Sequence, residues 1–105
     1  MASRNVESTL ETLVIALCLD YRRRQSAIES GSAPRRTDVE YRYYNFKIYD
    51  AVSEIAGERL ADRYIDEIGQ RVGYAKSSIA CVSETIYKQY KRLIINNIAK
   101  KLHLC

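Results

Sequence analysis

Residues 68–82 read IGQRVGYAKSSIACV, and their apolar and glycine positions are spaced as in a helix-turn-helix. Ile68 and Val72 lie four residues apart and share one face of a helix, and Gly69 gives that face a point where a second helix can approach closely. We expect Gly73 to end this helix in a left-handed turn, with Tyr74 packed at the corner. The alternative is two ordinary amphipathic helices joined by a glycine turn.

A second helix of the motif is predicted to begin at Lys76, Ser77 and Ser78, where the two hydroxyl groups can cap it. Further along, Ile79 and Val82 return an apolar edge toward the first helix. With its flanking turns, the predicted helix-turn-helix covers residues 62–92.

This arrangement gives each polar residue a role on DNA. Ser77 and Ser78 are expected to reach phosphates or base edges, and Lys76 a phosphate or a guanine. Arg71 lies on the flank, where it would contact the DNA backbone. Farther along the same helix, Ala80, Cys81 and Glu84 are poor readers of bases.

A second arrangement remains open, in which the recognition helix lies in residues 82–92, VSETIYKQYKR. It has better hydrogen-bond donors, but no glycine precedes Val82 to make the turn. The side chains it would present to DNA are those of Thr85, Lys88, Gln89, Lys91 and Arg92.

Composition is consistent with a small, basic, globular protein. The 105 residues are 47% hydrophobic and 29% charged, with a net charge of +4, which indicates one folded domain with a core of its own. The basic residues are unevenly placed. No acidic residue follows Glu84, whereas five lysines and arginines do. Such an end attracts phosphate, or it is a solvated helix face that complements the helix dipole.

Catalytic and metal-binding patterns are missing from the sequence. There is no phosphate-binding loop or nucleophile elbow, and His103 is the single histidine, so we expect no enzyme and no cofactor. Asp62 and Asp66 share a helix face and could hold a divalent ion, but a solvated acidic surface explains them better.

The three cysteines are widely spaced and odd in number, which favours a reduced, cytoplasmic protein. Cys18 and Cys81 are expected in the core. The apolar run at residues 13–19 is too short for a membrane span and lacks the flanks of a signal peptide.

The first half of the chain predicts two helices. Apolar residues recur at helical spacing across residues 6–28, with Gly31 at the end, and the only proline lies in the following loop, residues 29–38. Thr37–Glu40 has the form of a capping box that would start a second helix ending at Gly57. A strand is the alternative for residues 44–48, where aromatic and polar residues alternate.

The second half predicts a helix over residues 58–72 and a long apolar stripe over residues 79–102. Ser83 could cap a new helix and divide this last segment. We therefore expect an all-α fold of four to five helices, with residues 1–105 forming a single domain that contains a helix-turn-helix.

Three stretches of the chain resemble short ArpU-like phage and prophage transcriptional regulators, which are related to the C-terminal helix-turn-helix of sigma factors. They are DYRRRQSAIESGS, VEYRYYNFKIYDAVSEI and IGQRVGYAKSSI…SETIYKQYKRLIINNIAKKLHL, and the last carries the most specific pattern. The resemblance implies an all-helical protein of late phage gene control, with Lys88, Lys91 and Arg92 in its basic helix. Ala75, Ala80 and Cys81 depart from what the motif prefers.

The leading hypothesis is thus a transcriptional regulator that binds double-stranded DNA, with a homodimer and RNA polymerase or another host protein as further candidate partners. The rival is a helical protein-interaction module, either a phage-encoded inhibitor of a host nucleoprotein or an oligomerisation domain. Exposed Lys88, Lys91 and Arg92 on one side would favour DNA. An exposed apolar patch of Tyr87, Tyr90 and Ile95 would favour a partner protein.

Overall fold

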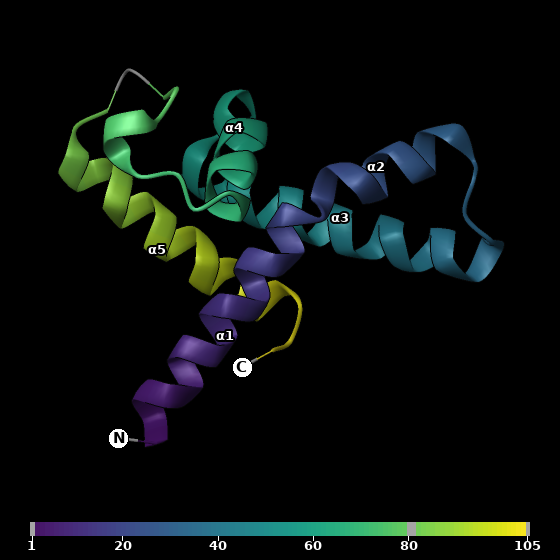
Figure 1. Ribbon diagram of the computed structural model, residues 1–105, viewed down its shortest axis with the longest axis horizontal. Helices are drawn as coiled ribbons and strands as arrows, with labels where there is room; N and C mark the ends of the chain where they lie inside the picture. Colours follow the sequence, from purple (N-terminus) through teal and green to yellow (C-terminus); the bar gives the residue numbers. More distant parts are fainter. Residues whose placement is uncertain (1, 80–81, 105) are drawn as a thin grey trace.

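The structure is a computed structural model that describes the backbone of residues 2–79 and 82–104, with side chains from residue 9 (Figure 1). Helices make up most of it, and no strand occurs among these residues, so the all-α prediction is confirmed and the strand considered for residues 44–48 is not present. The elements are α1 Ala2–Leu19, α2 Tyr21–Ser30, α3 Arg35–Ala56, α4 Glu58–Gly69, a short 3-10 turn η1 Tyr74–Lys76, and α5 Glu84–Lys101.

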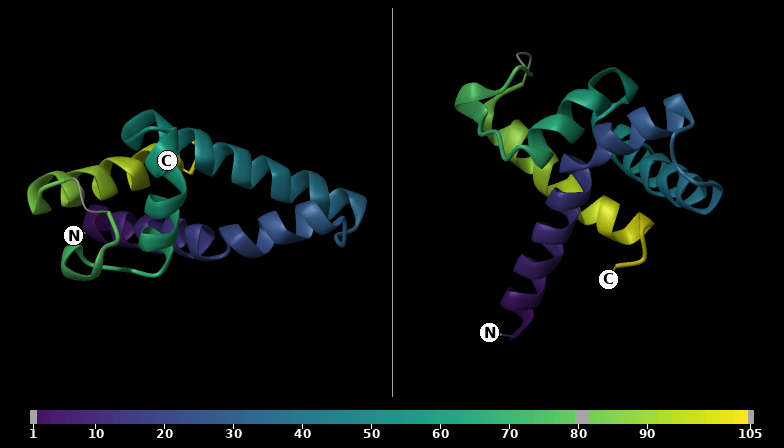
Figure 2. Two further views of the ribbon diagram at one scale, coloured as in Figure 1. Left: turned by 90° about the horizontal axis from the view of Figure 1, so that it is seen from above. Right: turned by 45° about the vertical axis from the view of Figure 1, so that its right-hand side comes forward.

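The longest helix, α3, organises the others. Its N-terminal half forms a hairpin with α2 that projects to one side, and its C-terminal half packs against α4 and α5 (Figures 1 and 2). Helix α1 crosses the body and contacts both α4 and α5. This arrangement buries one face of each helix and leaves the hairpin open to solvent on its outer side.

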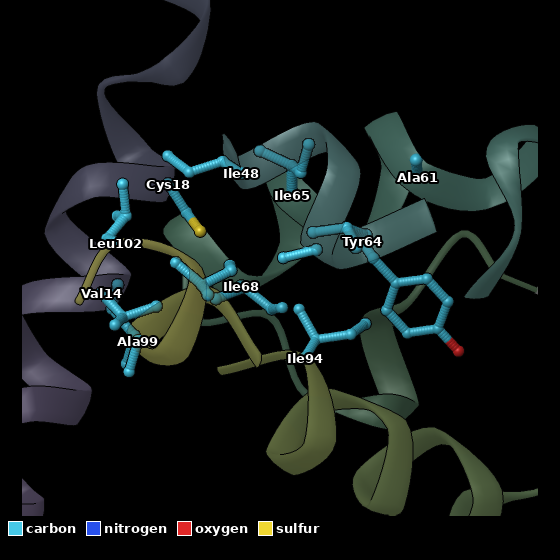
Figure 3. Packing of buried hydrophobic residues seen from close by; sticks show 14 of the residues in the cluster. Val14, Cys18, Ile48, Ala61, Tyr64, Ile65, Ile68, Ile94, Ala99 and Leu102 are labelled. Carbon is cyan, nitrogen blue, oxygen red and sulfur yellow. The ribbon is translucent and has the colours of Figure 1, made fainter. Parts of the chain in front are cut away.

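The core lies where α1, α3, α4 and α5 meet (Figure 3). Ile48, Ile68 and Ile94 come from three different helices and are all fully or almost fully buried. Cys18 is 2% exposed, as predicted, and burial raises the pKa of its thiol to about 12. The corresponding prediction for Cys81 lies outside the described residues.

The helix predicted over residues 6–28 is two helices that meet at Asp20. Arg24 is buried there, and its guanidinium donates hydrogen bonds to the Leu17 carbonyl at 2.6 Å and to the Asn45 side chain at 2.7 Å. The Asn45 amide in turn donates to the Tyr21 carbonyl. A side chain that takes a carbonyl of the helical ladder bends the helix, which is why the apolar period alone missed the break.

The capping box at Thr37 does not start α3. The helix begins at Arg35 after Pro34, and the amide of Asp38 donates to the Pro34 carbonyl at 2.8 Å. Thr37 therefore lies in the first turn instead of before it. The ends predicted at Gly31 and Gly57 are confirmed, and both glycines have positive φ.

Helix α4 ends at Gly69, one turn earlier than predicted, and the left-handed residue is Arg71 and not Gly73. Arg71 has φ 56°, whereas Gly73 has φ −86° and ψ 170°, an ordinary extended conformation. The amide of Val72 donates to the Glu67 carbonyl and that of Arg71 to the Ile68 carbonyl, which is a Schellman closure. Because this closure already ends α4 at residues 70–72, Gly73 does not need to adopt the left-handed conformation.

No helix begins at Lys76, Ser77 or Ser78, so the first arrangement of the helix-turn-helix is wrong. The chain between α4 and α5, described at residues 70–79 and 82–83, is instead a long connection that contains η1, far longer than the turn of such a motif. Helix α5 begins at Glu84, and the Ser83 hydroxyl accepts a hydrogen bond from the Ile86 amide. The division of the last segment at Ser83 is thus confirmed.

Gly69 does give a point of close approach, but to α1. A Cβ at Gly69 would lie 2.6 Å from the Leu19 amide nitrogen and 2.7 Å from the Leu19 Cα, both backbone atoms. We expect Gly69→Ala to lower the free energy of unfolding by about 1–3 kcal/mol, the usual cost of overpacking. Gly73→Ala is the matched control, since no atom lies within 4 Å of its added Cβ. Equal thermal stability of the two variants would contradict this crossing.

Candidate nucleic-acid interface

Basic side chains of α5 line an open groove of about 770 Å³ between α5 and α1. Lys88, Lys91 and Arg92, which were predicted as DNA contacts, all contribute to it. Helix α1 adds Leu10 and Glu11 on the opposite wall, and the remaining lining residues belong to α5: Ile95, Asn96, Ala99 and Lys100. The structure therefore brings four of the five basic residues of α5 to one side, whereas Lys101 pairs with Asp50 and Glu54 of α3.

Their arrangement follows from helical spacing. Lys88, Arg92 and Lys100 lie at intervals of four and eight residues, with Asn96 between the last two, so they form a ridge along the helix. At 1.5 Å per residue, the ridge is about 18 Å long. Four cationic side chains in the groove face one carboxylate, that of Glu11, so the groove is positively charged.

The basic side chains of this groove differ in the contacts that they make within the protein. Lys88 lies 4.0 Å from the Glu84 carboxylate in an exposed i,i+4 pair, which is weak in water. Arg92 and Lys100 are exposed and make no ion pair within the described residues. These three side chains can turn toward an anion at little cost.

Lys91 is held by the protein itself. Its ammonium donates to the Val72 carbonyl at 2.7 Å and lies 5.2 Å from the centre of the Tyr87 ring. Burial lowers the pKa of Lys91, and the carboxylates of Glu67 and Glu11 offset part of that effect. Lys91 therefore fixes the connection after α4 onto α5 and is not free to bind a ligand.

The connection between α4 and α5 closes on the buried carboxylate of Glu67, which is 6% exposed. The Ser77 hydroxyl donates to it at 2.6 Å, and the Ser78 amide and hydroxyl each donate at 2.8 Å. From α5, the Tyr87 hydroxyl donates at 2.6 Å. Ser77 and Ser78 thus hydrogen-bond to Glu67 in this structure, and the roles predicted for them on DNA stay predictions.

Sequence reasoning missed Glu67, although a signal was present. Glu67 is three residues after Tyr64 and seven after Leu60, so it falls on the apolar face of its helix. An acidic residue at such a position must find donors when it is buried. The serines and tyrosines of residues 74–87 could have been recognised as those donors.

Hydrogen bonds decide the charge state of Glu67. Burial raises the pKa of its carboxyl group, but the hydrogen bonds from Ser77, Tyr87 and Ser78 together lower it by more, so the pKa lies below its usual value. Conversely, burial and the bond to Glu67 raise the pKa of Tyr87 to about 12. The group at neutral pH is a carboxylate surrounded by neutral donors.

The other two predicted residues lie at the edges of this region. Arg71 is exposed in the turn next to Val72, whose carbonyl Lys91 contacts. Lys76 is exposed at the end of η1. This short turn lies against α5, where the ring of Tyr74 packs 5.6 Å from the ring of Tyr87, measured between ring centres. Both side chains flank α5 without forming part of the groove.

Two alternatives from the sequence can be compared with this geometry. Tyr87 is buried, and Tyr90 and Ile95 pack against the core, so they form no exposed apolar patch. Asp66 pairs with Arg22, and no cluster of three metal-ligating side chains occurs among the described residues.

Comparisons of the chain with protein-family models, curated proteins and solved structures find no match. Among the residues that the structure describes, no helix combines the length and apolar character needed to cross a bilayer.

Glu67→Gln tests the buried carboxylate. Because the native pKa of Glu67 is lowered, its contribution to stability is complete above the unfolded value near 4.5 and is lost as pH falls through the native pKa. We expect Gln to cost about 1–3 kcal/mol at neutral pH, since its amide cannot accept all these bonds, and less in acid. Chemical denaturation at several pH values measures this difference.

The exposed Glu40, changed to Gln, is the control and should leave the stability at neutral pH unchanged. A cost for Glu67→Gln that does not shrink between neutral and acidic pH would show that the charge of Glu67 plays no part.

Proposed function

We propose that the protein binds double-stranded DNA through the exposed side of α5. The observation that carries this proposal is the ridge of Lys88, Arg92 and Lys100, three cations that no buried contact restrains. A row of free cations on one helix is the usual electrostatic footprint of a phosphate-binding surface.

The same side of α5 also carries groups that can read bases. Thr85, Gln89 and Asn96 are exposed and lie beside the basic ridge at helical spacing. Amide side chains make paired hydrogen bonds to adenine in the major groove, which is wide enough to admit a helix. This surface therefore supports the second of the two arrangements that the sequence left open.

The structure changes which residues are proposed as contacts. Lys88 and Arg92 remain, and Lys100 joins them. Lys91, Ser77 and Ser78 hydrogen-bond within the protein and are not among the proposed contacts, while Arg71 and Lys76 are proposed as flanking contacts to the DNA backbone. Transcriptional regulation of the phage type, implied by the resemblance to ArpU-like proteins, is the role proposed for this binding.

Salt dependence of DNA affinity tests the proposal. Each cation that neutralises a phosphate contributes about 0.9 to the slope of log affinity against log salt. Replacing Lys88, Arg92 and Lys100 together by alanine should flatten the slope by roughly 2.7 and should leave the helix intact, because alanine is a good helix former. Fluorescence anisotropy with a random duplex at several salt concentrations measures both slopes.

The matched control removes the same charge elsewhere, by replacing the exposed Arg35, Arg42 and Arg59 with alanine. We expect this variant to keep the wild-type slope. No DNA binding by the wild type at low salt, or an equal loss of slope in both triple variants, would overturn the proposed surface.

A further inference from the structure

Helix α3 carries an exposed apolar stripe that no other described element covers. Val39, Tyr43 and Phe46 lie at i, i+4 and i+7, on the side of α3 opposite to the buried Ile48 and Val52. Val39 is 61% exposed and Phe46 is 68% exposed. Contiguous apolar side chains of this size on a surface mark an interaction site more often than scattered ones do.

A positive charge lies at one end of the apolar stripe and a negative charge at the other. Arg36 precedes it on the same side of the helix, is exposed, and makes no ion pair within the described residues. Asp50 follows it on that side, near Glu54. The Lys101 ammonium is shared between these two carboxylates, at 3.1 Å and 2.5 Å, so one negative charge is left over at this end.

The order of charged and apolar side chains along this side of α3 is complementary to the same order in a second, antiparallel copy of the helix. Tyr43 lies midway between Arg36 and Asp50, about 10 Å along the helix from each. A twofold axis at Tyr43 therefore sets Arg36 of one copy against Asp50 of the other and brings Val39 next to Phe46. A surface that a twofold axis maps onto itself is what a symmetric dimer requires.

We propose that the protein forms an antiparallel homodimer through the outer side of α3. The hairpin of α2 and α3 projects from the body, so the outer side of α3 from Arg36 to Phe46 is open to a second copy, while its Asp50 end lies next to Lys101 of α5 (Figures 1 and 2). One pair of helices buries less surface than a standard interface, so the dimer is weak and depends on concentration. The proposal does not rest on DNA binding.

Sedimentation equilibrium of the whole chain over a wide concentration range tests the proposal. The mass should rise from one chain to two for the wild type. Phe46→Glu should raise the dimer dissociation constant by about tenfold or more, because it puts a charge in the apolar interface. Its circular dichroism spectrum should not change, and neither should its melting temperature at a concentration where the wild type is monomeric, since the side chain is outside the core. Leu19→Glu, at a side chain 62% exposed on α1, is the matched control and should dimerise normally.

A charge exchange tests the antiparallel arrangement. Arg36→Asp alone should weaken the dimer, because it sets two acidic residues against each other at both ends. Adding Asp50→Arg to it should restore the dimer, while Glu54 keeps Lys101 in place. A wild type that stays monomeric, a Phe46→Glu variant that dimerises as tightly as the wild type, or a double variant that does not recover would each overturn the proposal.

Discussion

The buried carboxylate of Glu67 is the constraint on which the second half of the structure depends. A charge in the core is tolerated only when its oxygens are fully hydrogen-bonded. Glu67 meets this demand with donors from two places, the connection after η1 and the first turn of α5. The penalty for leaving it unpaired therefore holds the connection folded against α4 and fixes where α5 begins.

This constraint also divides the polar residues into two groups. Those that face α4 are used internally: Ser77 and Ser78 bind Glu67, and Lys91 binds the Val72 carbonyl. Those on the far side of α5 are left to solvent, among them Arg92 and Lys100. A rigid scaffold that presents free cations on one helix suits phosphate binding, since little ordering is needed when the ligand arrives.

Apolar periodicity predicted the helices well because it reports burial directly. It placed the α-helical fold correctly, while the capping signal of Ser83 gave the division of the last segment. It failed at Asp20 and at Gly73, where polar contacts decide the backbone. The break at Asp20 needs Arg24 to reach Asn45 on another helix, and the early end of α4 follows from a Schellman closure at Arg71, a residue with no intrinsic preference for that turn. The first is a long-range contact, and the second places a non-glycine residue in the left-handed conformation, so apolar spacing reports neither.

The basic side of the candidate site was visible in the sequence because helical spacing places Lys88 and Arg92 together. The sequence did not show which basic side chains are exposed and which are hydrogen-bonded within the protein. That difference depends on the path of the connection between α4 and α5, which sequence alone does not give. Lys91 looks like its basic neighbours in the sequence but lies over Tyr87 in the fold.

Hydrogen exchange at the Ser78 amide tests the role of Glu67 most directly. This amide lies outside any helix, and its partner is the Glu67 carboxylate at 2.8 Å. Measured by NMR in the wild type, it should be protected from exchange, and Glu67→Gln should remove that protection while the amides in the middle of α3 keep theirs. An amide that exchanges at the rate of an open loop in the wild type would contradict the account.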